Sequence, residues 1–128
     1  MDLSIDIYAD TAYLNEIAAW ATEPDIRGFT VNPTLLRQAG VGQYQEWAHA
    51  ALALLQQWEG ITPGRPDLPL SLPMLAPDLE HMEIQAHAIA AWGRNVFVKV
   101  PIQTSAGEST LPLIKKLSHD GIPLNVTA

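Results

Sequence analysis

Lys99 has the clearest potential for chemistry in this sequence, because it stands inside the apolar run NVFVKVPIQT, residues 95–104. In a strand buried on both faces, the alternating valines would pack beneath helices while Lys99 points the other way. Loss of hydration favours the neutral amine and so lowers the lysine pKa from its usual value of about 10.4. The neutral amine is the form that attacks a carbonyl carbon to give a Schiff base. The alternative is a lysine whose ammonium reaches solvent at the end of the strand.

Four polar residues could work with such a lysine. Asp10 ends the first expected strand and could exchange protons with the substrate, or it could simply cap the next helix. Asn32 could likewise bind a substrate or cap a helix, and Thr30 and Thr127 are ordinary strand residues when each is taken alone. Because parallel strands end at one edge of a sheet, we expect these four residues and Lys99 on a common rim, as an active site requires.

Alternating strand and helix patterns must position these residues. Strand patterns cover residues 3–10, 28–31, 68–75, 95–101 and 122–128, and helix patterns cover residues 11–21, 43–58, 78–92 and 107–121, with a further helix beginning at Pro33. This alternation predicts an α/β fold of parallel βαβ units, about four βα units and then a fifth strand, in a single domain over residues 1–128. Taken alone, this order suits an open doubly wound sheet, since a closed (β/α)₈ barrel needs about 250 residues.

The overall composition excludes several classes of function. The formal net charge is -7 with only 7 lysines and arginines, which argues against a nucleic-acid partner. The sequence has no cysteine, which excludes thiolate catalysis, and no segment approaches the roughly 20 apolar residues of a membrane span. Since a basic leader is also absent, we expect a cytoplasmic protein without a membrane partner. Phosphate-loop patterns and i, i+4 histidine pairs are absent, so no cofactor and no metal site are expected.

Four stretches of the sequence resemble successive blocks of the transaldolase family, which includes small members similar to fructose-6-phosphate aldolase. These stretches are IYADTAYLNEI, GFTVNPTLL, NVFVKVPI and GIPLNVTA, and they follow in the family's order over nearly the whole chain. The resemblance implies a (β/α)₈ TIM barrel, of which this chain holds the N-terminal half: about four βα units plus the fifth strand. It also implies class I aldol chemistry of the pentose phosphate pathway, in which a lysine forms a Schiff base with a ketose phosphate and a dihydroxyacetone unit passes to an aldehyde.

The resemblance also assigns a role to each candidate residue. Lys99 in VKVP matches the Schiff-base lysine, and Asp10 in ADTA matches the aspartate that acts as acid and base at the hydroxyl next to the breaking bond. Asn32 and Thr30 in FTVNPT match residues that hold hydroxyls of the substrate or the carbinolamine, and Thr127 in NVTA matches a threonine of the pocket. A sugar phosphate is therefore the expected substrate.

Two departures from the family leave alternatives open. Pro73 in SLPML takes the place of a Glu or Gln that handles the catalytic water, a task that Asp78 could take over. The sequence also lacks the family's strands six to eight, with the serine and arginine that hold the substrate phosphate. If these 128 residues are the whole molecule, we expect the half barrel to pair with another chain, as in a homo-oligomer, or to remain poorly stable. The alternatives are a catalytically silent transaldolase-like scaffold, fragment or subunit, and an unrelated flavodoxin-like binding domain, which strand order would distinguish.

Overall fold

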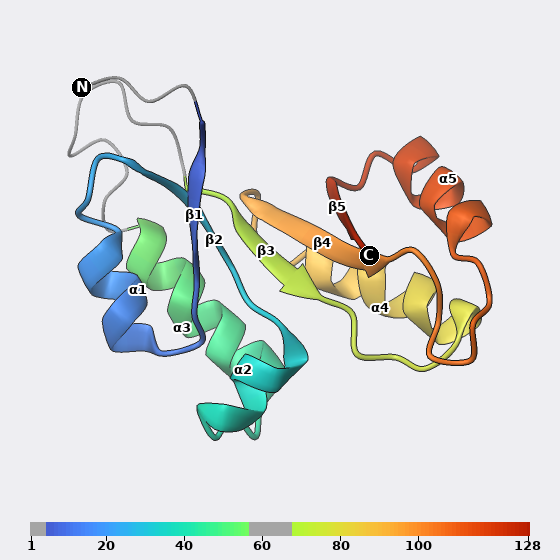
Figure 1. Cartoon of the computed structure of the whole chain (residues 1–128), viewed down its shortest axis with the longest axis horizontal. Coiled ribbons are helices and arrows are strands. Elements are labelled where there is room, and N and C mark those ends of the chain that lie inside the picture. The colour runs from blue at the N-terminus through green and yellow to red at the C-terminus, as the bar shows by residue number, and fades with distance from the viewer. Residues whose placement is uncertain (1–4, 57–67) are drawn as a thin grey trace. The chain divides into compact units, whose positions relative to one another are not determined.

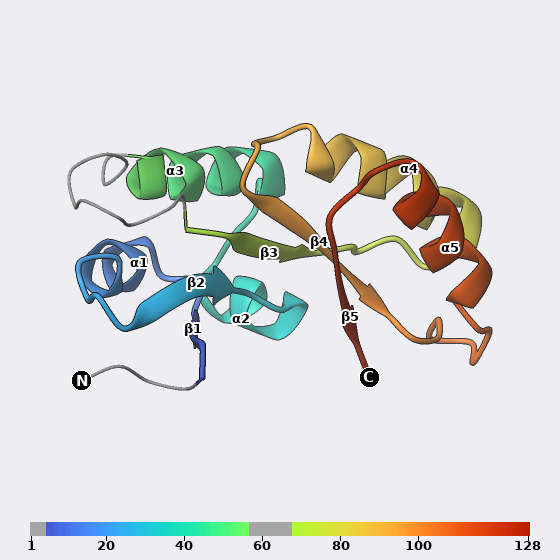
Figure 2. The same ribbon diagram turned by 90° about the horizontal axis from the view of Figure 1, so that it is seen from above.

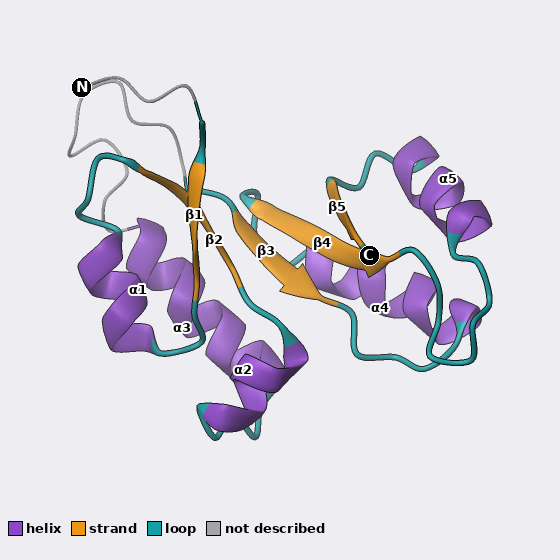
Figure 3. Ribbon diagram, in the orientation of Figure 1, coloured by secondary structure: helices purple, strands orange, loops and turns teal. Residues whose placement is uncertain are grey.

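A computed structural model describes residues 5–56 and 68–128 of the chain, in which strands and helices alternate (Figures 1 and 3). The strands are β1 (Ile7–Asp10), β2 (Ile26–Thr30), β3 (Leu70–Pro73), β4 (Val96–Pro101) and β5 (Leu124–Thr127), and the helices are α1 (Leu14–Trp20), α2 (Pro33–Gln38), α3 (Tyr44–Gln56), α4 (Leu79–Ala90) and α5 (Leu111–His119). The predicted elements are confirmed, except that the first residues of the first strand and the end of the third helix at Trp58 lie outside the described residues. Within the described ranges, no helix combines the length and apolarity needed to cross a membrane.

The order of the strands identifies the type of α/β fold. The strands hydrogen-bond in the order in which the chain makes them, β1-β2-β3-β4-β5, and both β1–β2 and β4–β5 are parallel. In doubly wound sheets, including the flavodoxin type, the strand order reverses at a switch point. A parallel sheet wound in chain order is instead that of a (β/α)₈ barrel, of which this chain holds four βα units and the fifth strand. The flavodoxin-like alternative is therefore wrong.

Backbone contacts divide the chain into two compact units, residues 1–70 and 71–128. In the first unit, α1 packs against α3, and the two helices lie side by side in Figures 1 and 2. Ile17 of α1, Phe29 of β2 and Ala48 of α3 are fully buried. The indole Nε1 of Trp47 donates to the carbonyl oxygen of Ala12 at 2.9 Å, which ties α3 to the segment between β1 and α1.

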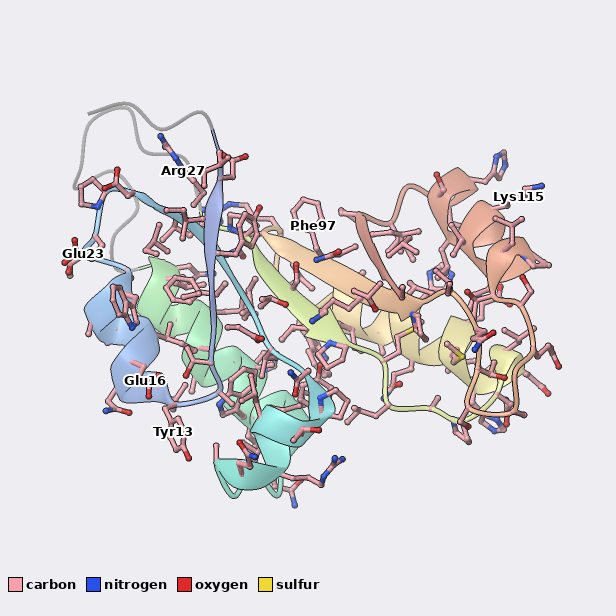
Figure 4. All side chains as sticks on the ribbon, in the orientation of Figure 1. Tyr13, Glu16, Glu23, Arg27, Phe97 and Lys115 are labelled. Atoms are coloured by element: carbon pink, nitrogen blue, oxygen red, sulfur yellow. The ribbon has the colours of Figure 1, made fainter. Side chains whose placement is uncertain are left out.

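In the second unit, α4 packs on β4 and on α5. The three valines of β4 are at most 1% exposed, and Ile89 of α4 and Leu117 of α5 are fully buried with them. Phe97 and Lys99 alternate with these valines and so belong to the other face of β4; Phe97 is labelled in Figure 4. The prediction that Lys99 points away from the helix-covered face is therefore confirmed.

Candidate active site

The first unit places Asp10 and Thr30 at the same level on neighbouring strands. Asp10 of β1 is in register with Thr30 of β2, and one step earlier Ala9 is in register with Phe29. Since residues paired in a parallel ladder share a face, and Phe29 is buried against the helices, Asp10 and Thr30 share the opposite face. Asp10 is exposed and Thr30 is partly buried, so this pair can be reached by a ligand.

Tyr8 and Gly28 occupy the same face two residues before Asp10 and Thr30. They are register partners, and the ring of Tyr8 lies directly over Gly28. A Cβ atom on Gly28 would come within 2.6 Å of Tyr8 Cε2 and 2.9 Å of Pro69 Cγ. The glycine therefore makes room for an aromatic ring beside the candidate residues.

The turn that follows β1 is held by Thr11, which bears on whether Asp10 caps the next helix. Thr11 is buried. Its Oγ1 accepts a hydrogen bond from the Tyr13 backbone N–H at 3.1 Å and donates one to Glu16 Oε2 at 2.9 Å. Its backbone N–H donates to the carbonyl of Thr30, which continues the β1–β2 ladder. The carboxylate of Asp10 is thus not the group that holds the start of α1.

Asn32, in contrast, is a helix cap, as one of its two interpretations expected. Its Oδ1 accepts a hydrogen bond from the Leu35 backbone N–H at 2.8 Å, and Pro33 follows at the first turn of α2. Capping uses the amide oxygen and fixes the side chain next to the end of β2. Any contact of Asn32 with a substrate would therefore come from the amide Nδ2 group.

The second unit places Lys99 and Thr127 on neighbouring strands. Lys99 of β4 is in register with Asn125 of β5, and Pro101 is in register with Thr127. Asn125 and Thr127 are two residues apart on β5 and lie on the same face as Lys99. Thr127 is therefore about 7 Å beyond Asn125 along the strand direction. Lys99 and Thr127 are both partly buried.

The sequence interpretation missed two polar residues on the face of the sheet that carries Lys99. The Nδ2 of Asn125 donates to Ser71 Oγ of β3 at 3.2 Å, a hydrogen bond that passes across β4. Ser71 is only 2% exposed. Ser71 and Asn125 therefore link β3 to β5 on the face of β4 that carries Lys99. The sequence contained a signal for Asn125, which lies two residues before Thr127 at the strand period, but none for its bond with Ser71.

Pro73 lies two residues after Ser71 on β3 and is buried. Its ring offers no side-chain donor or acceptor at the place where the resemblance expects a carboxylate or amide. The suggested substitute, Asp78, caps α4: its Oδ1 accepts from the His81 backbone N–H at 2.9 Å and lies 2.7 Å from His81 Nδ1. These bonds from His81, first from its backbone and then from its side chain, hold the pKa of Asp78 below its usual value. Asp78 is thus engaged as a cap.

A group of possible metal ligands lies away from this face, on the helices of the second unit. Glu83 and His87 of α4 and Asp120 after α5 each bring one ligand atom to within 4.8 Å of the others. The sequence interpretation looked only for histidine pairs, and so it missed the i, i+4 spacing of Glu83 and His87.

The family model described as Transaldolase/Fructose-6-phosphate aldolase matches residues 7–128. Similar curated proteins named "Probable transaldolase" occur in Dehalococcoides mccartyi (35% identical, covering 94% of this chain and 50% of the relative), Coprothermobacter proteolyticus (32%, covering 94% and 48%) and Thermus thermophilus (32%, covering 96% and 52%).

The chain thus spans about half the length of the curated relatives it matches. The matched half contains every candidate residue discussed above, from Asp10 to Thr127. With the family match over residues 7–128 and the barrel-type order of its strands, the chain belongs to the transaldolase/fructose-6-phosphate aldolase family.

Proposed function

We propose that this chain carries the Schiff-base lysine of a transaldolase-type reaction on a ketose phosphate, and that Lys99 is this nucleophile. The observation that carries the proposal is the setting of Lys99 within a chain of this family. It is a partly buried lysine on the face opposite three buried valines, in register with the amide of Asn125. A lysine amine in such a setting is the kind of nucleophile that adds to a carbonyl carbon to give a Schiff base.

In the proposed reaction, the Lys99 amine adds to the ketone carbon of the ketose to give a carbinolamine. Loss of water then gives an iminium ion, which accepts the electron pair of the adjacent C–C bond as that bond breaks. The proton of the neighbouring hydroxyl passes to the Asp10 carboxylate, an aldehyde leaves, and the remaining dihydroxyacetone enamine adds to an acceptor aldehyde. The resemblance is the support for Asp10 as the proton carrier, together with its register with Thr30.

Hydroxyl and amide groups on these faces suit a polyhydroxylated substrate. In the second unit, Asn125 is the register partner of Lys99 and Thr127 lies two residues further along β5. In the first unit, Thr30 and the Nδ2 group of Asn32 lie near the end of β2. We assign the binding of sugar or carbinolamine hydroxyls to these groups.

Borohydride trapping tests the proposal directly, because the chain has only three lysines, Lys99, Lys115 and Lys116. The folded chain is incubated with fructose 6-phosphate, and in parallel with dihydroxyacetone, then reduced and mapped by peptide mass spectrometry. We expect the reduced adduct on Lys99 and its loss in Lys99→Arg. Lys115→Arg is the matched control, since Lys115 is exposed on α5 (Figure 4). Folded protein with no adduct, or with label spread evenly over the three lysines, would refute the role of Lys99.

The second candidate function is a catalytically silent scaffold, and Pro73 is the observation that favours it. Without a side chain to bind or activate water there, carbinolamine dehydration and imine hydrolysis lose assistance. Pro73→Glu separates the two functions if the trapping rate is measured beside it, with circular dichroism to confirm folding. A rise in trapping rate of about tenfold or more would indicate an impaired enzyme, whereas no trapping in either protein would indicate a scaffold.

A further inference from the structure

Helices α4 and α5 of the second unit bring together three side chains that are common metal ligands. Glu83 and His87 are one helical turn apart on α4, and Asp120 directly follows α5. The two helices pack together, as Figures 1 and 2 show. The Nε2 of His87 lies 3.2 Å from Asp120 Oδ2, and one carboxylate oxygen of Glu83 is within 4.8 Å of both.

These distances suit a small tetrahedral metal ion. Zinc takes histidine nitrogen and carboxylate oxygen at about 2.0–2.1 Å, so neighbouring ligand atoms around it are about 3.3 Å apart. The pair of His87 and Asp120 already has this spacing, at 3.2 Å. Glu83 is partly exposed, so a rotamer change can bring its oxygen in as the third ligand and leave the fourth position to water.

Lys116 shows that the group already attracts a positive charge. Its Nζ lies 2.9 Å from Asp120 Oδ2 and 3.3 Å from Glu83 Oε1. The hydrogen bonds to Asp120 and then Glu83 raise the pKa of Lys116, and Lys116 in turn lowers the pKa of Asp120. One ammonium against two carboxylates leaves the group net negative when the imidazole is neutral.

The ammonium can be displaced from this position. The side chain of Lys116 is 55% exposed, and it borders an open pocket of about 330 Å³ between α4 and α5, together with Glu83, Leu79 and Pro112. A divalent ion would neutralise both carboxylates and coordinate the imidazole nitrogen at the same time. The lysine stem can then lie along the apolar wall of the pocket with its charge in water.

We propose that Glu83, His87 and Asp120 bind a zinc ion in place of the Lys116 ammonium and so join α4 to α5. Zinc fits better than magnesium or calcium, because those ions take oxygen ligands and would leave His87 unused. The bound ion would stabilise the second unit, since it binds the folded arrangement of two helices and not the unfolded chain.

Calorimetric titration of the metal-free chain with zinc chloride, in a buffer that does not bind zinc, tests the proposal. We expect one saturable site and a higher melting temperature with zinc. His87→Ala and Asp120→Asn should each weaken binding at least about tenfold, and the exposure of these side chains keeps the risk of misfolding small. Lys116→Met should strengthen binding, because it removes the competing charge and keeps the length of the stem.

His81→Ala is the matched control. His81 also lies on α4 and also pairs with an aspartate, Asp78, but no third ligand is grouped with that pair in the described residues. Its loss should leave zinc affinity unchanged, as should Lys99→Arg, which separates this site from the proposed reaction. Absence of saturable binding, equal binding by His87→Ala, or weaker binding by Lys116→Met would overturn the proposal.

Discussion

Gly28→Ala should destabilise the protein through a steric clash with the ring of Tyr8. The added Cβ would lie 2.6 Å from Tyr8 Cε2 and 2.9 Å from Pro69 Cγ, both closer than van der Waals contact allows. Overpacking of this kind costs about 1–3 kcal/mol. Replacement of a strand glycine by alanine recovers about 0.5–1 kcal/mol of backbone entropy.

The net loss in the free energy of unfolding should therefore be about 0–2.5 kcal/mol. Tyr8 is 42% exposed, so its ring can turn towards solvent, which places the expected value in the lower half of that range, near 1 kcal/mol. Urea unfolding followed by circular dichroism measures it, and an unchanged m value would show that only stability has changed.

A double-mutant cycle identifies the cause. In a Tyr8→Ala background two of the three nearest contacts, including the one at 2.6 Å, are gone, so Gly28→Ala should cost less there by at least about 0.5 kcal/mol. Gly42→Ala is the control, because a Cβ at Gly42 meets nothing within 4 Å. If Gly28→Ala is as stable as the wild type, or if Tyr8→Ala gives no relief, the explanation by Tyr8 is refuted.

Three further predictions concern hydrogen bonds and ion pairs. Trp47→Phe removes the donor to the Ala12 carbonyl and should lower the free energy of unfolding by about 1–3 kcal/mol in urea titrations, whereas equal stability would show that this bond contributes nothing. Asn32→Ala should cost about 0.5–2 kcal/mol through loss of the α2 cap while Asn32→Asp retains most of it, and equal losses in both would contradict the cap as the cause. Lys116 lowers the pKa of Asp120 below 3.8, so the pair stabilises the fold above that pH and this contribution is lost as pH falls through the lowered pKa. Acid unfolding of Asp120→Asn should lack this component, and an unchanged acid profile would show that the pair does not contribute.

Much of the secondary structure could be predicted because alternation of apolar residues encodes which face of a strand is buried. The valines of β4 are an example: they are buried, and their alternation with Lys99 along the chain is enough to assign the lysine to the opposite face. The type of α/β fold could not be derived in the same way, since open and barrel sheets share the same alternation and differ only in which strands pair. That information lies in hydrogen bonds between segments distant in sequence.

The candidate site shows the same limit. Asp10 and Thr11 are adjacent and both suit a helix start, and only the observed hydrogen bond from Tyr13 identifies Thr11 as the residue that holds it. The bond between Asn125 and Ser71 joins two strands with a third between them, a relation that spacing along the chain does not contain. Asp120 lies close to Glu83 and His87 because α5 packs on α4, and the sequence alone does not show this packing.

The division of the chain within β3, just before Ser71, has a consequence for local opening. Lys99, Ser71 and Asn125 all belong to residues 71–128, and the hydrogen bond between Asn125 and Ser71 closes this unit over 54 residues. A compact unit of this kind tends to open and close cooperatively. The surroundings of the lysine should therefore open as one unit, distinct from the segment that carries Asp10. Hydrogen exchange should then show two protection levels, with the amides around Lys99 protected independently of those around Asp10.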